Sequence, residues 1–452
     1  MNKNNKIFST LLIVFFTITI SVSGQVPVIE IPNVVSPFTI QTPGQNVPNS
    51  QVRQFNSLPN VPNPNVPNPN NSMEIYERDM REMQRRNAEL NRILQDYSER
   101  QPTIHYDFPS QLGRYGTQYY QQALEKLSAM LRGDIPLNLK DAVFAVENAF
   151  FENQLPYSDY SNAINKLAQT AYLKGTQDGH NWNNPVTKNI MLFRAMADTL
   201  EIKVPQMETS IVSYPMQYDF DDFWGKNDWT KMFVSKLLAT NSGQCRSLPL
   251  LYLILCEMTG AEAHLAYSPS HSYIKFQDNS GNWHNLELTN GSIVSDAFVV
   301  GSGYVASEAI RNGTYLQAQT KEQVIAGCIS DLAMGYIDKF GYDSFIKQCL
   351  DTVFKYDPNN LSALKIQANY STRRAMYVVS QLGRPSLEVL KSNYPRAYAL
   401  VEEMHRAYER VDATGHRDMP AEAYEVWLRS VNEEKERREH NERYNRIIRG
   451  IR

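Results

Sequence analysis

Apolar residues recur at intervals of three and four over much of the chain, which is the spacing of one helical face. Between residues 101 and 205 this pattern predicts four helices, with breaks at Pro136 and Pro156, at residues 118–131, 139–151, 160–173 and 186–200. A highly charged stretch at 74–100 carries a narrower apolar stripe, made by Met83, Leu90, Leu94 and Tyr97. Residues 73–205 are therefore expected to form a helical N-terminal region.

The middle of the chain, residues 206–320, has a mixed pattern. A helix is expected at 229–239, and residues 246–258 are apolar on every side of a second helix, which predicts a buried central helix that stops at Gly260. Three strand-like runs follow, the last two joined by the turn signal D-N-S-G-N, at residues 262–267, 272–277 and 283–289. This region is expected to pack a small antiparallel sheet against the central helix.

Residues 321–452 return to helical spacing. The word Y-D-P-N-N-L-S-A-L at 356–364 resembles the junction between tetratricopeptide repeats, and Phe354, Ala363 and Ala368 fit that pattern. One or two degenerate repeats are expected, because a solenoid needs several stacked units. The charge-dense C-terminal end is expected to be a solvated helix. The predicted fold class is therefore α+β and mostly helical, with helical regions on both sides of the central one.

The first 72 residues do not have the composition of a folded core. Residues 1–24 combine a short positive start with an apolar run and small residues, which predicts a signal peptide cut before Gln25. The alternative is an uncleaved membrane anchor, for which the apolar run is short. Residues 25–72 are rich in Pro and Asn and predict a disordered, semi-stiff tether. The chain is expected to be exported, to the periplasm or outside the cell, with no membrane span after cleavage.

Charge and cysteine content limit the partners, metals and disulfides that can be expected. The net charge is -3 with both signs mixed along the chain, so no nucleic-acid partner is expected. No Cys/His cluster has zinc-ligand spacing, and we expect neither a metal nor a cofactor. Export would permit disulfides, so Cys328 and Cys349 are candidates to bridge two adjacent helices, whereas Cys256 is expected to be a buried small hydrophobe.

Three residues in the central region carry candidate catalytic groups. Cys245, in N-S-G-Q-C-R-S-L, comes at the start of the predicted central helix, where unpaired amides and the helix dipole stabilise a thiolate. His271 opens the second strand and Glu287 lies on the third. A thiol, an imidazole and a carboxylate are the parts of a cysteine acyl-transfer site.

The His271 and Glu287 side chains can meet only if their two strands pair in a register that places both on the same face. If paired residues have numbers that sum to an even value, His271 and Glu287 point to the same face of the hairpin and lie within reach of each other. The carboxylate would then fix the tautomer and orientation of the imidazole. In an odd register the two side chains would lie on opposite faces.

The words G-Q-C-R-S-L, H-S-Y-I and W-H-N-L-E-L-T resemble the transglutaminase-like superfamily, a branch of the papain-like cysteine enzymes, over residues 206–320. The resemblance implies a papain/transglutaminase-like core, with Cys245 as nucleophile, His271 as general base and acid, and Glu287 in the acid position. That position usually holds Asp, so the side chain here is one methylene longer. Framework roles are implied for Gly243, Trp283 and Thr289.

Other residues of the region were weighed for supporting or rival roles. The oxyanion is expected to bind the Cys245 amide, with Gln244 or Asn241 as a further donor. Trp224 and Trp229, in D-F-W-G-K-N-D-W, are candidates to line a substrate cleft, with core packing as the alternative. The rivals are His264 for His271, His284 as a neighbour that should face away, and Asp296 as a substitute acid.

Two functions from different classes follow from these observations. The first is an exported cysteine hydrolase or acyltransferase that acts on amide bonds of polypeptides through a Cys-His-Glu triad, with water or an amine as acceptor. The second is a non-catalytic scaffold, in which a degenerate transglutaminase-like fold and tetratricopeptide-like helices present a groove to a protein partner. A perturbed thiol pKa would favour the first and an inert thiol the second.

Overall fold

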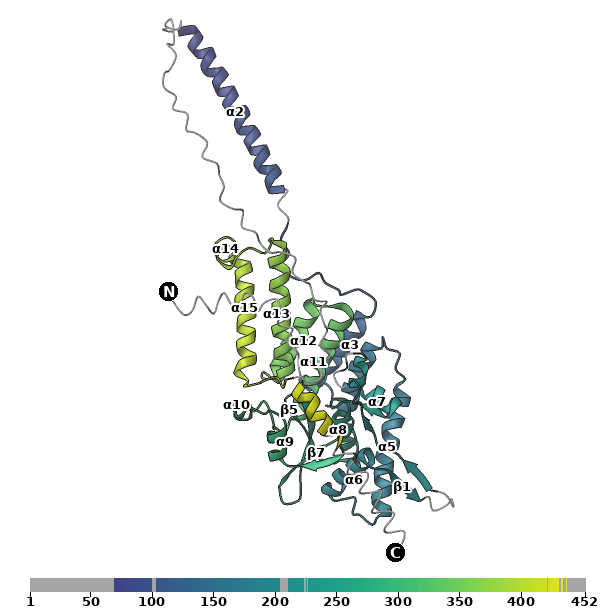
Figure 1. The fold of residues 1–452 in the computed structure, drawn as a ribbon. Coiled ribbons are helices and arrows are strands. Elements are labelled where there is room, and N and C mark those ends of the chain that lie inside the picture. The colour runs from purple at the N-terminus through teal and green to yellow at the C-terminus, as the bar shows by residue number, and fades with distance from the viewer. Residues whose placement is uncertain are drawn as a thin grey trace. The chain divides into compact units, whose positions relative to one another are not determined.

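The computed structural model describes residues 69–99, 103–203, 210–222, 225, 227–420, 422–430, 432–433 and 436 (Figure 1). The predicted signal peptide and most of the predicted tether lie outside these residues, and so does Trp224. The chain divides into a unit of residues 31–105 and a body that begins at Tyr106.

In the first unit, the described structure is one long helix, α2 (Pro69–Glu99). It begins within the last residues of the predicted tether and covers the charged stretch that predicted a helix. None of its described side chains is buried. Ion pairs one turn apart join Arg81 to Glu77 and Arg86 to Glu82, at 3.5 Å and 2.7 Å.

The body is α+β and mostly helical, as the sequence predicts. Its first four helices match the predicted ones closely: α3 (Thr117–Arg132), α4 (Leu139–Phe150), α5 (Tyr157–Gln177) and α6 (Pro185–Ala197). Asn138 and Asn184 cap α4 and α6 by accepting amide hydrogens of the first turn. The predicted end of the fourth helix, residue 200, is wrong. Helix α6 ends at Ala197, and Leu200 already belongs to strand β1 (Leu200–Lys203), which pairs with β2 (Ser210–Ser213).

A buried helix, α8 (Ser247–Thr259), forms the centre of the body. All its residues from Ser247 to Cys256 are buried, and it ends at Gly260, which takes a left-handed conformation with φ 67°. The predicted helix before it is present in two parts, η1 (Trp229–Met232) and α7 (Val234–Thr240). A short parallel pair, β3 (Gln217–Tyr218) and β4 (Ser242–Gly243), brings residues before η1 alongside the turn that leads into α8.

The main sheet is antiparallel and has the order β5-β6-β7-β8. The three predicted strands are β5 (His264–Ser268), β6 (His271–Gln277) and β7 (Trp283–Glu287), and the short β8 (Ser292–Val294) was not predicted. Asp278 and Gly281 shape the β6–β7 turn: the Asp278 carboxylate accepts the amides of Ser280 and Asn282, and Gly281 has φ 80°.

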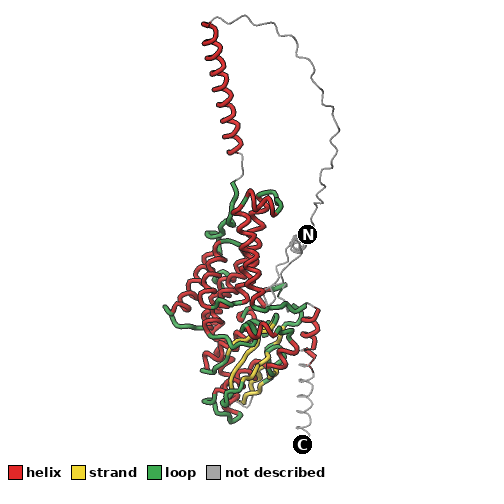
Figure 2. The backbone as a smooth tube through the Cα atoms, turned by 90° about the vertical axis from the view of Figure 1, so that its left-hand side faces the viewer, coloured by secondary structure: helices red, strands yellow, loops and turns green. Residues whose placement is uncertain are grey.

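A layer of helices follows the sheet, made by α9 (Asp296–Ser302), α10 (Ser307–Arg311), α11 (Lys321–Phe340), α12 (Ser344–Tyr356), α13 (Leu361–Gln381), α14 (Leu387–Asn393) and α15 (Pro395–Ala413). The longest of them pack in pairs, α11 with α12 and α13 with α15. Figure 2 shows the strands gathered in one half of the body and the long C-terminal helices in the other. After α15 the chain turns back, and a helical stretch at 422–430 lies beside the central region (Figure 1, yellow).

Among the described residues, no helix is long and apolar enough to cross a membrane.

Candidate active site

His271 and Glu287 meet in the interior of the body. The Nε2 atom of His271 lies 2.7 Å from Oε2 of Glu287, and the two residues are only 5% and 6% exposed. The strands pair in an even register, with Ile274 opposite Leu286, so both side chains emerge on the same face. The longer carboxylate arm is held in place because its second oxygen accepts the Thr289 amide at 2.9 Å.

A tight turn sets the position of His271 at the start of β6. Ser268 and His271 pair across the end of the β5–β6 hairpin, so that Pro269 and Ser270 form a two-residue connection. Ser270 has φ 57°, a left-handed conformation that costs a non-glycine residue about 1 kcal/mol or more. Its buried hydroxyl has no hydrogen-bond partner among the described residues. Backbone strain therefore lies directly next to the imidazole.

Cys245 lies in the turn between β4 and α8, one residue before the helix N-cap, and is 1% exposed. The Tyr218 hydroxyl donates to its Sγ atom at 3.9 Å. The hydroxyl of Ser272, the residue after His271, donates to the Cys245 carbonyl. The start of β6 and the turn before α8 are therefore tied together, which fixes the thiol relative to the imidazole.

The electrostatics of the site favour a charged imidazole. Burial by itself would lower the pKa of His271, but its electrostatic interactions, first with Glu287 and then with Cys245, outweigh burial and raise that pKa to about 10. Burial opposes ionisation of Glu287 as well, yet the neighbouring imidazolium holds its pKa below the usual range. Glu287 is hydrogen-bonded to the Nε2 nitrogen of the ring. The other ring nitrogen, Nδ1, is buried and has no hydrogen-bond partner in the described part of the chain.

The C-terminal stretch 422–430 covers this site. The indole of Trp427 lies edge-on to the His271 ring, with 4.9 Å between ring centroids. Tyr424 is buried beside Trp427, and its pKa is raised by burial and by electrostatic interaction with Cys245. This contact is not predicted from the sequence above, although the aromatic and apolar spacing of Tyr424, Trp427 and Leu428 is a signal for a packed helical face.

A hydrophilic cavity of about 260 Å³ reaches His271 from the side of the helical layer. Its lining is mostly hydroxyl and carboxamide groups, including those of Ser268, Ser272, Asn312, Gln319 and Asn360. Two ion pairs involve charged residues of the lining, Arg246 with Asp331 at 3.0 Å and Lys365 with Asp418 at 3.2 Å.

The second of these pairs anchors the chain just before the covering stretch. Lys365 is buried on α13, and this burial lowers its pKa to about 8 although the Asp418 carboxylate opposes the shift. Two residues earlier, His416 bonds Asp418 through Nε2 at 2.9 Å and the hydroxyl of Tyr315 through Nδ1. Residues 414–418 are therefore fixed to the helical layer by buried polar contacts.

The two predicted oxyanion donors lie in different surroundings. Gln244 is buried next to Cys245, and its Nε2 atom donates to the Asp222 carbonyl at 2.5 Å. Asn241 is exposed at the end of α7, where it takes a left-handed conformation and donates its amide to the Pro215 carbonyl at 2.7 Å. Only Gln244 thus shares the buried environment of the thiol.

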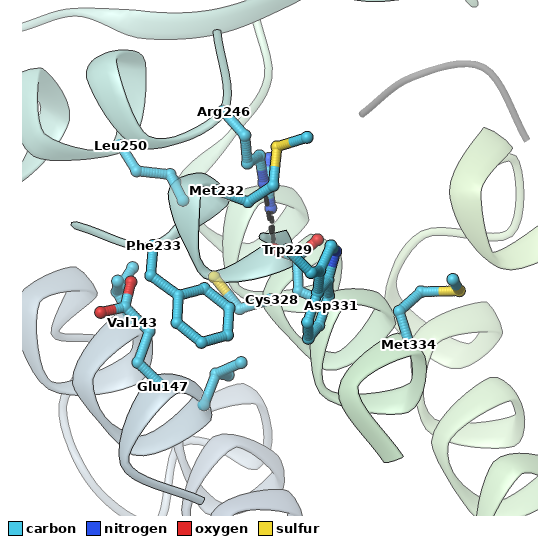
Figure 3. Close-up of a pocket in the computed structure, with 11 residues that line it drawn as sticks. Val143, Glu147, Trp229, Met232, Phe233, Arg246, Leu250, Cys328, Asp331 and Met334 are labelled. Atoms are coloured by element: carbon cyan, nitrogen blue, oxygen red, sulfur yellow. Dashed lines mark hydrogen bonds and ion pairs between the residues drawn. The ribbon is translucent and has the colours of Figure 1, made fainter. Parts of the chain in front are cut away.

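Trp229 faces a separate, small cavity (Figure 3). It packs edge-on against Phe150 and Phe233, with 5.2 Å between ring centroids in each case. The cavity, of about 20 Å³, also borders Glu147, whose carboxylate accepts the amides of Val234 and Ser235 at 2.6 Å and 2.8 Å. Burial raises the pKa of Glu147 to about 7. Trp229 is therefore placed in the core and not in the lining of the cavity that reaches His271.

The rival residues make other contacts. His264 donates from Nδ1 to the Gln319 carbonyl at 3.1 Å, and His284 bonds Asp278 at 2.9 Å on the other face of the hairpin. Asp296 pairs with Lys275 at 2.9 Å and accepts from Asn285 at 2.8 Å.

The described cysteines are all free thiols, so the candidate bridge between Cys328 on α11 and Cys349 on α12 is not formed. Within the described ranges, no group of three or more His, Cys, Asp or Glu residues has a geometry that could hold a metal ion.

Comparisons with family models, with curated proteins and with solved structures found no match to this chain.

Proposed function

We propose that this protein is a cysteine acyl-transfer enzyme with a transglutaminase-like central region at residues 206–320. In this proposal Cys245 is the nucleophile, His271 is the general base and acid, and Glu287 orients the imidazole. The observation that carries the proposal is the buried contact of 2.7 Å between His271 and Glu287. The neighbouring Cys245 thiol also interacts electrostatically with this imidazole. A core role alone does not require three ionisable groups to be buried together.

The reaction would begin with attack of the Cys245 thiolate on the carbonyl carbon of a polypeptide amide. A C–S bond forms, and the carbonyl oxygen takes the negative charge, which in this proposal the Cys245 amide and Gln244 stabilise. The His271 imidazolium gives its proton to the amide nitrogen, the C–N bond breaks, and the amine leaves. Water or a second amine then attacks the thioester and passes a proton to His271, and the thiolate is released.

Substrate access is part of the same proposal. With Cys245 only 1% exposed and Trp427 against His271, a carbonyl group cannot reach the sulfur in the arrangement described. Catalysis therefore requires the stretch 422–430 to move away. The hydrophilic cavity beside His271 then provides the adjoining space for the polypeptide.

A second candidate function is a non-catalytic interaction scaffold. The observation that favours it is the covered thiol itself, because a site that never opens has no turnover. In that case the tetratricopeptide-like helices around α12 and α13 would bind the partner. For both candidates we propose export, on the basis of the predicted signal peptide at residues 1–24.

One experiment separates the two candidates. The rate of Cys245 alkylation is measured against pH by peptide mass spectrometry, in the full chain and in Trp427→Ala, each with and without His271→Ala. An enzyme predicts an apparent thiol pKa well below the free value of about 8.5, which rises when His271 is removed. His264→Ala, outside the site, is the matched control and should change nothing. An ordinary thiol pKa that does not depend on His271 would leave only the scaffold.

A further inference from the structure

Helix α2 carries a repeating apolar pattern that a single helix cannot bury by itself. Residues at alternating spacings of three and four form one continuous seam, namely Met73, Tyr76, Met80, Met83, Asn87, Leu90, Leu94 and Tyr97. These are the a and d positions of nearly four heptads, with a positions at 73, 80, 87 and 94. Seven of the ten apolar or aromatic residues between 73 and 99 lie on this seam. A helix that packs on a globular core would instead show a wider apolar face.

The described side chains of this seam are not buried, and most of them are exposed. Met73 is 68% exposed, Met83 54% and Leu90 54%, so their apolar surface has not been removed from water. Helices of this kind gain little stability from propensity alone, and most of their stability comes from burying an apolar face. Within its own unit, none of the described residues covers the heptad seam of this 31-residue helix.

We propose that α2 is a parallel, two-stranded coiled coil, and that its partner is the α2 helix of a second copy of this chain. Asn87 is the residue that identifies this partner. It is the single polar side chain on the seam and stands at an a position, where it would meet Asn87 of the second copy and form a hydrogen bond. An antiparallel pair would place it against apolar d-position residues and leave its amide buried without a partner.

Charge along the flanks agrees with this pairing. In a parallel pair the charged g-position residues Asp79 and Arg86 face uncharged e-position residues of the second copy, Gln84 and Asn91. No like charges are therefore opposed in these described heptads. The arginines at 78, 85 and 92 occupy the f position, which is furthest from the seam and stays in water.

Light scattering on the purified full chain over a range of concentrations tests the proposal. The wild type is expected to have twice the mass of one chain. In the double variant Met83→Lys, Leu90→Lys, which places two charges on the seam, the dissociation constant should rise by about 100-fold or more. The double variant Glu82→Lys, Glu89→Lys, with the same lysines one residue away, should stay dimeric.

Orientation is tested separately with Met73→Cys. Only a parallel, in-register pair brings residue 73 of both copies together, so mild oxidation should join two chains through a disulfide. Asn87→Leu should tighten association and yield mixed oligomers, because the residue that selects two strands is lost. A monomeric wild type, or a dimer that survives the lysines on the seam, would overturn the proposal. A dimer that is lost with these lysines but forms no disulfide at residue 73 would overturn the parallel arrangement.

Discussion

The Nε2 atom of His271 lies 2.7 Å from the Glu287 carboxylate in a fully buried position, although the two residues come from different strands of the sheet. The contact exists because β6 and β7 pair in an even register and because the Glu287 side chain is anchored by the Thr289 amide. The charge of Glu287 is the largest influence that counters the cost of burying an imidazolium.

Replacing this carboxylate by an amide should remove that support. In Glu287→Gln the pKa of His271, now about 10, is expected to fall below the free-histidine value of about 6.5, since burial then acts with less opposition. The shift can be followed by NMR titration of the imidazole. Asp296→Asn, which removes a carboxylate that pairs with Lys275 of the same sheet, is the control. An unchanged His271 pKa in Glu287→Gln would contradict the assignment of Glu287 as the orienting acid.

Trp427→Ala should open the candidate active site. The indole covers His271, and its loss is expected to raise the alkylation rate of Cys245 by about 10-fold or more, which corresponds to roughly 1.4 kcal/mol of opening. Val426→Ala is a matched control, because Val426 lies on the same helical stretch and is 61% exposed. If both variants left Cys245 as slow to react as the wild type, residues 422–430 would not control access.

Lys365→Met should loosen the covering stretch without touching it. Lys365 is buried and pairs with Asp418, so its loss is expected to speed hydrogen exchange over residues 414–430 while α13 itself keeps its protection. In the wild type, deprotonation of Lys365 above about pH 8 should not add to this loosening, because its folded pKa of about 8 lies below the ordinary lysine value of about 10.4 and loss of the proton therefore favours the buried state. Lys391→Met on α14 provides the control. Equal exchange in the two variants would rule out the Lys365–Asp418 pair as an anchor.

Glu147 should make the stability of the body depend on pH. Its folded pKa of about 7 exceeds the ordinary unfolded value of about 4.3, so protons are bound more tightly in the folded state. The contribution to the free energy of unfolding, about 4 kcal/mol, is therefore full below pH 4 or so and is lost as the pH rises to about 7. Denaturant unfolding at several pH values should show the difference between Glu147→Gln and wild type moving in favour of the variant over this range. A constant difference would show that Glu147 ionises normally.

Much of this architecture could be predicted from the sequence because the signals are local. The spacing of apolar residues located α3 to α6 and α8, and the D-N-S-G-N turn located the β6–β7 hairpin. The parity condition for His271 and Glu287 could be stated in advance, but the register that satisfies it depends on packing of the sheet as a whole.

Contacts between distant segments could not be predicted in the same way. Lys365 and Asp418 are separated by 53 positions, and nothing in the charge-dense C-terminal sequence points to a particular site in the body. The stretch that holds Tyr424 and Trp427 is short, and its few apolar residues gave a weaker signal than the surrounding charges.

The cover over Cys245 has one further consequence, because it belongs to the same chain as the thiol it protects. A covering segment joined through a short connection acts at an effective concentration on the order of millimolar, whatever the abundance of the protein. Dilution of the protein would therefore not uncover the site. A single cut between α15 and residue 422 would remove this effective concentration, and the covering segment would then be free to dissociate from the site.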